Sequence, residues 1–243
     1  MANVAVPTNA TLGAAFNFQL FDDFYNKLDT TNNYIATLTD SGSITVANTN
    51  GGVAPLVPSD GTVADNDEAY LGMSVYPFLV AASKNMVVGG RAQFTEANTS
   101  AANIGFGLTS SVAANLLIDD GGGIRASGTS FAIVKVDGGT VWQCVSRNGS
   151  TAYTNTSTET AGGASYFTWE INISELLSTA CTVTFKVNNQ YLKDSTTGQV
   201  IRHKVLYSGL SAVSPFYAIK NGSTTLETLN ADNWYVGQSF VRN

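Results

Sequence analysis

The chain has 243 residues, of which 44% are hydrophobic and 12% charged, and its formal net charge is -6. The acidic balance, without a long run of either sign, argues against binding to nucleic acid by neutralising phosphates. No stretch approaches the roughly 18 apolar residues of a membrane-spanning helix, and no charged region precedes an apolar run at the N-terminus. We therefore expect neither a nucleic-acid nor a membrane partner.

Short segments rich in β-branched and aromatic residues recur along the whole chain between turn-forming residues. They predict strands at Tyr34–Leu38, Ser43–Ala47, Val87–Phe94, Ile104–Leu108, Phe131–Val136, Val141–Val145, Phe167–Ile171, Thr182–Val187, Lys204–Tyr207, Phe216–Ile219 and Trp234–Val236. Asp137–Thr140, Val187–Tyr191 and Lys220–Ser223 supply Asn and Gly turns, of which the first predicts a tight hairpin. The pattern predicts an all-β, antiparallel protein.

Three further segments break this pattern. Residues 1–15 are small and polar and predict an extended N-terminal arm that orders only against a neighbour. Residues 48–77, rich in Pro, Gly, Asn and Asp, predict a long exposed loop. Ser174–Ala180 predicts a single helical turn capped by Ser174. No internal repeat divides the chain, so we expect one β-sandwich domain over residues 16–243.

Three pairs of segments together resemble the concanavalin A-like and laminin-G-like β-sandwiches. They are GGRAQFTE with IGFGL, FTWEINI with TVTFKVNNQYL, and PFYAIKN with LNADNWYVGQ. The first resembles a pair of neighbouring strands in those folds, and the second resembles their central hairpin. The third resembles their closing strand pair, which returns beside an N-terminal strand, here FQLFDDF. The resemblance implies a concanavalin A-like jelly roll.

Within that class, IDDGGGIRASGTSFAIVKVDGGTVWQ resembles tailed-bacteriophage virion proteins, several of which decorate capsids. The resemblance implies a structural protein without enzymatic activity or cofactor, assembled in the host bacterial cytoplasm onto the capsid surface. Its partners would be the major capsid protein or other virion proteins, and copies of itself, with a homotrimer as one natural arrangement. The alternative is a carbohydrate-binding module of a tail fibre or adhesin, with a glycan as partner.

No carboxylate pair has the spacing of a glycosidase. Retaining glycosidases need two carboxyl groups about 5 Å apart. Asp119 and Asp120 are adjacent, and adjacent strand residues point to opposite faces, so this pair is not expected to face one substrate. Turn or solvent-face positions are the simpler interpretation of Asp22, Asp23, Glu170 and Glu175. We expect no catalytic residue.

The acidic loop residues Asp60, Asp65, Asp67 and Glu68 allow two interpretations. They could wrap a calcium ion, which takes several carboxylate and carbonyl oxygens, or form a solvated loop, which we favour because their spacing matches no EF-hand. Gly121–Gly123 are not followed by the GK[ST] of a phosphate loop, so a sharp bend or a close subunit contact is the better interpretation.

The aromatic, sulfur and imidazole side chains have mainly structural interpretations. Trp142, Trp169 and Trp234 could form a sugar-stacking platform, but their apolar neighbours favour the core. Tyr70 and Tyr76 are expected to be exposed in loops, where they could contact either a sugar or a protein partner. Cys144 and Cys181 lack metal spacing and predict buried free thiols, with a disulfide as the alternative. The single histidine, His203, is expected on a strand surface.

Overall fold

The computed structural model describes residues 18–25, 28–46, 52–59, 61–96, 101–149, 151–162 and 164–239. The described residues form strands and connecting turns without a helix, as the sequence predicts. The described part of the chain therefore contains no helix that is long and apolar enough to cross a membrane. The expected arm at residues 1–15 lies outside the described residues.

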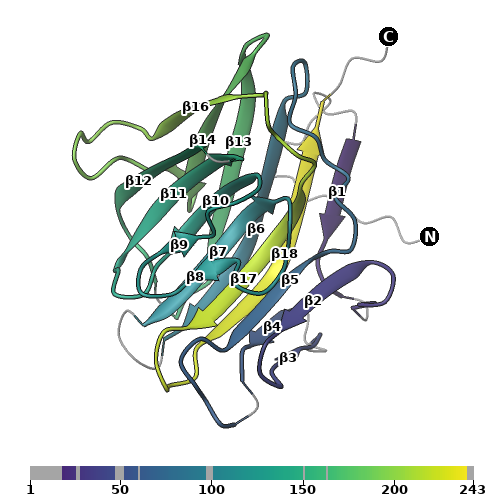
Figure 1. Ribbon diagram of the computed structural model, residues 1–243, viewed down its shortest axis with the longest axis vertical. Coiled ribbons are helices and arrows are strands. Elements are labelled where there is room, and N and C mark those ends of the chain that lie inside the picture. Colours follow the sequence, from purple (N-terminus) through teal and green to yellow (C-terminus); the bar gives the residue numbers. More distant parts are fainter. Residues whose placement is uncertain are drawn as a thin grey trace.

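The strands form two large antiparallel sheets (Figure 1). The nine-stranded sheet contains β1 (Phe18–Asp22), β3 (Ser43–Ile44), β4 (Ala54–Val57), β6 (Met86–Thr95), β13 (Phe167–Leu177), β14 (Ala180–Val187), β15 (Gln190–Tyr191), β16 (Arg202–Leu206) and β18 (Thr228–Gln238). The seven-stranded sheet contains β2 (Tyr34–Leu38), β5 (Glu68–Met73), β7 (Ala102–Thr109), β10 (Ser130–Lys135), β11 (Val141–Asn148), β12 (Thr151–Thr160) and β17 (Ser214–Asn221).

The order of strands in each sheet fixes which side chains become neighbours. The larger sheet runs β15–β14–β13–β6–β18–β4–β3, with β1 also paired to β18 and β16 to β14. The smaller sheet runs β12–β11–β10–β7–β17–β5–β2. Strands that are far apart in the sequence, such as β6 and β18, are therefore hydrogen-bonded partners.

Side chains alternate between the two faces of each strand, as the period of two requires. On β13, Phe167, Trp169 and Ile171 are buried between the sheets, whereas Thr168 and Glu170 point to the other face. The inward-facing side chains of both sheets make the main hydrophobic core. The outward-facing side chains of the larger sheet build the candidate site described below.

The three tryptophans lie in the core, which confirms the favoured interpretation of these residues. Trp142, Trp169 and Trp234 are each 1% exposed. The ring of Phe106 lies between two of them, with its centroid 5.3 Å from Trp142 and 5.0 Å from Trp169. Such tilted and edge-on pairs stabilise a core by about 1 kcal/mol beyond the area that they bury.

The outer face of the seven-stranded sheet is covered by residues 110–128, which include β8 (Leu117–Ile118) and β9 (Gly123–Ile124) (Figure 1). A second hydrophobic cluster lies beneath this cover. Its members are Tyr70, Val112, Leu116, Leu117, Ile124, Ala132, Val134, Val136, Val145, Phe216 and Ala218. Gly105 makes room for the cover, since a Cβ there would lie 3.0 Å from Leu117. Apolar packing therefore occupies this face of the smaller sheet.

Two of the three segment pairs that were expected to be neighbouring strands lie in opposite sheets and do not pair with each other. The segments at 89–96 and 104–108 form β6 and β7, which belong to opposite sheets, and β17 and β18 are divided in the same way. Consecutive strands of a jelly roll often cross between its two sheets, so closeness in sequence does not make them partners. The β13–β14 hairpin and the return of β18 beside β1 are confirmed.

Two expected connections are strands in the structure. Residues 48–77 include all of β4 and β5, so this segment is not one long exposed loop. Ser174–Ala180 forms no helical turn, because β13 continues to Leu177 and β14 begins at Ala180. The ladder that β13 makes with β14 outweighs the local helical preference of this short segment.

The prediction of two buried free thiols is confirmed. The prediction that His203 lies on a strand surface is wrong. Cys144 and Cys181 are both buried and free. His203 is 3% exposed. Its Nδ1 lies 2.8 Å from Oγ of Ser146 and its Nε2 lies 3.0 Å from Oδ1 of Asn155. Burial lowers the pKa of His203 to about 4, so the imidazole is neutral at physiological pH.

Candidate functional site

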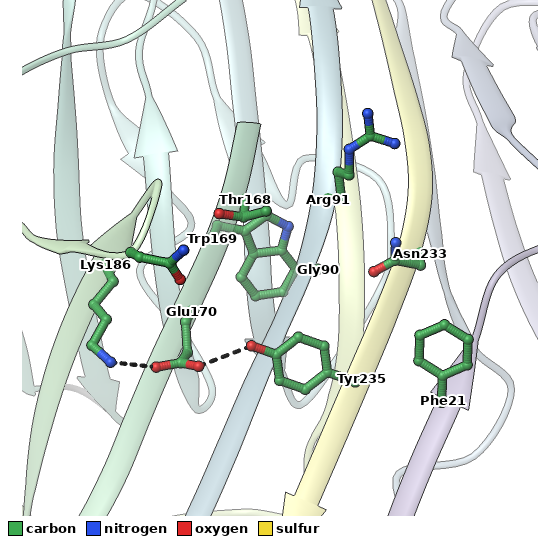
Figure 2. A pocket seen from close by; sticks show the side chains of 10 residues that line it. Phe21, Gly90, Arg91, Thr168, Trp169, Glu170, Lys186, Asn233 and Tyr235 are labelled. Atoms are coloured by element: carbon green, nitrogen blue, oxygen red, sulfur yellow. Dashed lines mark hydrogen bonds and ion pairs between the residues drawn. The ribbon is translucent and has the colours of Figure 1, made fainter. Parts of the chain in front are cut away.

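One row of side chains crosses the outer face of the nine-stranded sheet, perpendicular to its strands. Phe21 on β1 pairs with Tyr235 on β18, and Tyr235 pairs with Gly89 on β6. Gly89 pairs with Glu170 on β13, and Glu170 pairs with Lys186 on β14. Directly paired residues in an antiparallel sheet point to the same face, so these residues form a continuous row (Figure 2).

Glu170 is the centre of this row and is held by three donors. Lys186 Nζ lies 2.8 Å and Asn172 Nδ2 lies 2.6 Å from its Oε1, and the hydroxyl of Tyr235 donates to Oε2 at 2.9 Å. Burial opposes the ionisation of Glu170, but these hydrogen bonds outweigh it and lower its pKa. Glu170 therefore lies on the outer face of the sheet, as expected from the sequence, and is in addition an ionised acceptor in a fixed position.

Gly89 lets Tyr235 reach Glu170 across the strand between them. A Cβ at this position would overlap the phenol of Tyr235 and would lie 2.6 Å from the carbonyl oxygen of Trp169. Without a side chain on β6, the phenol ring lies over the backbone and joins β18 to β13 (Figure 2). The glycine is thus part of the site because of the space that it leaves.

A second row, one repeat further along the strands, completes the pocket. Arg91 on β6 forms an ion pair with Asp232 at 2.9 Å, and its guanidinium lies 4.2 Å from the ring centroid of Tyr166. The pocket has a volume of about 270 Å³. It is lined by Phe21, Gly90, Arg91, Thr168, Trp169, Glu170, Lys186, Asn189, Asn233 and Tyr235.

The lining combines fixed hydrogen-bonding groups with aromatic surface. Cationic, amide, hydroxyl and carboxylate groups supply donors and acceptors, and Phe21 and Tyr235 supply ring faces. Glu170 is the one carboxylate among the lining residues, and glycoside hydrolysis by the usual mechanism requires two. This chemistry is suited to binding a polyhydroxylated ligand.

Asp119, Asp120 and Asp137 form a separate acidic cluster at the edge of the cover. Carboxylate oxygens of the three lie within 4.8 Å of one another. The expectation that Asp119 and Asp120 point apart is wrong, because Asp120 adopts a left-handed backbone conformation (φ 49°) in a turn, and strand alternation does not apply there. The sequence predicts Asp137 only as part of a hairpin turn, and its proximity to Asp119 and Asp120 was not predicted.

The donor set of this cluster fits a hard cation such as Ca²⁺, which prefers carboxylate oxygens. Oδ1 of Asp119 is buried and has no hydrogen-bond partner among the described residues. Burial raises the pKa of the neighbouring Asp65, and the charges of Asp119, Asp120 and Asp137 raise it further. These residues are therefore the ones that would hold a cation.

The carboxylates of the acidic loop, Asp65, Asp67 and Glu68, do not converge on one point. Glu68 is buried and forms an ion pair with Lys220 at 3.0 Å. Asp67 is also buried, and its Oδ2 accepts a hydrogen bond from the backbone of Ala64 at 2.7 Å. Neither is a solvated loop residue, and Asp60 lies outside the described residues. Among the three described residues, Asp65 is the one close enough to the acidic cluster for the charges of Asp119, Asp120 and Asp137 to act on it.

The remaining candidate residues are committed to structural contacts. Tyr70 is fully buried, contrary to the expected exposure, and Tyr76 is half-buried and accepts a hydrogen bond from the backbone of Val112. Asp22 accepts hydrogen bonds from the hydroxyl of Tyr34 and the backbone of Phe24. Glu175 accepts one from the backbone of Ser83, and Asp23 accepts one from Tyr25.

No protein-family model matches the chain, and no curated protein matches its sequence. Solved structures match its fold over nearly the whole length. An endo-1,3-beta-glucanase from Streptomyces sioyaensis is 11% identical, with a TM-score of 0.63, and the match covers 98% of this chain and 100% of that one. The carbohydrate recognition domain of Emp47p is also 11% identical, with a TM-score of 0.55 over 91% of this chain and 95% of that one.

The lectin UEA-II, solved in complex with galactose, is 12% identical, with a TM-score of 0.53 over 93% of this chain and 100% of that one. Identities this low show the fold alone. The chain has the all-β, concanavalin A-like fold of the legume lectins, and the predicted fold class is confirmed.

Proposed function

We propose that the chain binds carbohydrate, without hydrolysing it, in the pocket on the outer face of the nine-stranded sheet. The observation that carries this proposal is the fixed array of Tyr235, Glu170 and Lys186. Sugar hydroxyls need donors and acceptors held at defined positions, and the C–H faces of a sugar ring pack on aromatic rings. Phe21 and Tyr235 supply such rings beside the polar array.

The similar solved structures support the proposal only in general terms. One is a carbohydrate recognition domain, and another was solved with galactose. Between the two functions predicted from the sequence, these neighbours favour the carbohydrate-binding module. The role in a phage virion stays a prediction, tested by whether the purified protein rebinds particles that have been stripped of it.

A glycan array probed with and without calcium tests the proposal. The wild type should bind a defined set of sugars, and Arg91→Ala, which removes donors from the pocket, should weaken that binding at least tenfold. Tyr25→Ala is the control, because Tyr25 is exposed on a loop and is not part of the pocket lining. Failure to bind any sugar in either condition contradicts the proposal, and release of shorter sugars from a bound glucan contradicts its non-enzymatic part.

A further inference from the structure

We infer that the ligand of this pocket is an uncharged, linear oligosaccharide that lies across the strands, with its distal end stacked on Tyr191. This inference rests on the proposed sugar-binding function. It adds the direction, the charge and the minimum length of the bound chain. Tyr191 does not line the pocket, and it extends the site to the edge of the sheet.

The register of the sheet places Tyr191 in the same row as the pocket residues. Tyr191 on β15 pairs directly with Lys186 on β14, so both side chains point to the outer face. The ammonium group of Lys186 lies 4.9 Å from the centroid of the Tyr191 ring. The row therefore continues from Phe21 through Tyr235, Glu170 and Lys186 to Tyr191 without leaving this face of the sheet.

Tyr191 has the exposure that a stacking residue needs. The residue is 47% exposed, although its ring is held by Lys186 and its strand is the short edge strand β15. The turn before β15 is fixed by Asn188 and Asn189, both in the left-handed conformation with φ of 49° and 62°. An aromatic ring that is partly exposed yet fixed in place loses little conformational entropy when a sugar packs on it.

The distance between the aromatic residues sets the length of the ligand. The ring of Tyr235 lies over Gly89 on β6, and Tyr191 is three strands away on β15. Three strand spacings amount to about 14 Å. One sugar ring in an extended chain is comparable in length to one strand spacing, so a chain of about four rings reaches from Tyr235 to Tyr191.

The charges of the pocket favour an uncharged sugar. Lys186 is paired with Glu170, and Arg91 is paired with Asp232. Each charged group among the lining residues therefore already has its counter-charge. The anionic group of a carboxylated or sulfated sugar would lose its hydration on binding and would find no unpaired cation in the pocket to compensate. Neutral hydroxyl groups, in contrast, can form hydrogen bonds with the remaining donors and acceptors.

Calorimetric titration with oligosaccharides of two lengths tests the inference. The probes are the disaccharides and hexasaccharides of a linear β-1,3-glucan, a β-1,4-glucan and a β-1,4-galactan, with hexagalacturonic acid as the charged probe. A neutral hexasaccharide should bind at least tenfold more tightly than its disaccharide. Tyr191→Ala should remove most of this difference and leave disaccharide binding unchanged, since one stacking contact accounts for about a tenfold change.

Tyr25→Ala is the matched control and should bind like the wild type, because this exposed tyrosine lies outside the row. Equal affinity of Tyr191→Ala and the wild type for the hexasaccharide overturns the inference, as does tighter binding of hexagalacturonic acid than of every neutral probe. In both cases the sugar-binding function itself stands. If none of the four sugars binds, the inference fails, and the proposed function fails with it only if the glycan array also shows no bound sugar.

Discussion

The hydroxyl of Tyr235 lies 2.9 Å from Oε2 of Glu170, although these two residues are on strands that do not pair with each other. The intervening strand β6 carries Gly89 at this point, so the ring crosses over bare backbone. One glycine thus lets two side chains meet that are 65 residues apart along the chain. The geometry of the proposed sugar site depends on this connection.

Gly89→Ala should abolish sugar binding and destabilise the fold. The new methyl group collides with the Tyr235 phenol and with the Trp169 carbonyl, so Tyr235 must leave Glu170. Overpacking of this kind costs about 1–3 kcal/mol. The measurements are urea unfolding and sugar titration. In the control Gly198→Ala, the added Cβ meets nothing within 4 Å and only the positive φ opposes it, so sugar affinity should be unchanged. Normal sugar binding by Gly89→Ala would contradict this role of Tyr235.

Tyr235→Phe keeps the ring and removes the hydroxyl group. Because this hydroxyl donates to the carboxylate, its loss should raise the pKa of Glu170, which can be followed by NMR titration of the side-chain carboxyl. The free energy of unfolding should fall by about 1–2 kcal/mol. A pKa of Glu170 that does not change would mean that Lys186 and Asn172 alone hold the carboxylate.

His203 should make the fold less stable in acid. The pKa of this buried imidazole is lowered to about 4 from 6.5, so the unfolded chain binds the proton more tightly than the folded one. The neutral histidine contributes fully to the free energy of unfolding above pH 6.5. This contribution, up to about 3 kcal/mol, is lost as the pH falls from 6.5 toward 4. Carboxyl groups also titrate near the lower limit, so the comparison is between the wild type and His203→Gln. Parallel curves of unfolding free energy against pH for the two proteins would contradict the assignment.

The buried ion pair between Lys220 and Glu68 should show strong coupling. Both side chains are almost fully buried under residues 110–128, and both oxygens of Glu68 also accept a hydrogen bond from the backbone of Asn115. Lys220→Met leaves a buried carboxylate without its cation and should cost about 3–5 kcal/mol. In a double-mutant cycle, adding Glu68→Gln should recover part of this loss. Additive costs for the two substitutions would show that the pair is not coupled.

The sequence predicted the strands best where one face is buried. The alternation in FTWEINI predicts β13, because Phe167, Trp169 and Ile171 must all enter the core. The polar strand β12, TAYTNTSTET, was missed because it lies at a sheet edge and has no apolar period. The helical turn predicted at Ser174–Ala180 failed for a related reason, since pairing with β14 is a long-range interaction that local composition does not record.

The candidate site was harder to predict than the fold. Its residues come from β1, β6, β13, β14, β18 and the turn after β14, and only the sheet register brings them together. Glu170 lies at the edge of an apolar run in the sequence, and its partners Lys186 and Tyr235 are 16 and 65 positions away. The acidic cluster was missed because the left-handed turn at Asp120 turns two adjacent carboxylates toward the distant Asp137.

The location of a bound sugar tests the central claim most directly. Backbone amide signals of the protein, followed by NMR during titration with a neutral hexasaccharide, report which strands the ligand covers. We predict that the shifts are concentrated on the outer row of β18, β6, β13, β14 and β15, around Tyr235, Glu170 and Tyr191. Shifts confined to the turns that carry Asp119 and Asp137, or no shifts with any neutral hexasaccharide, would contradict the account.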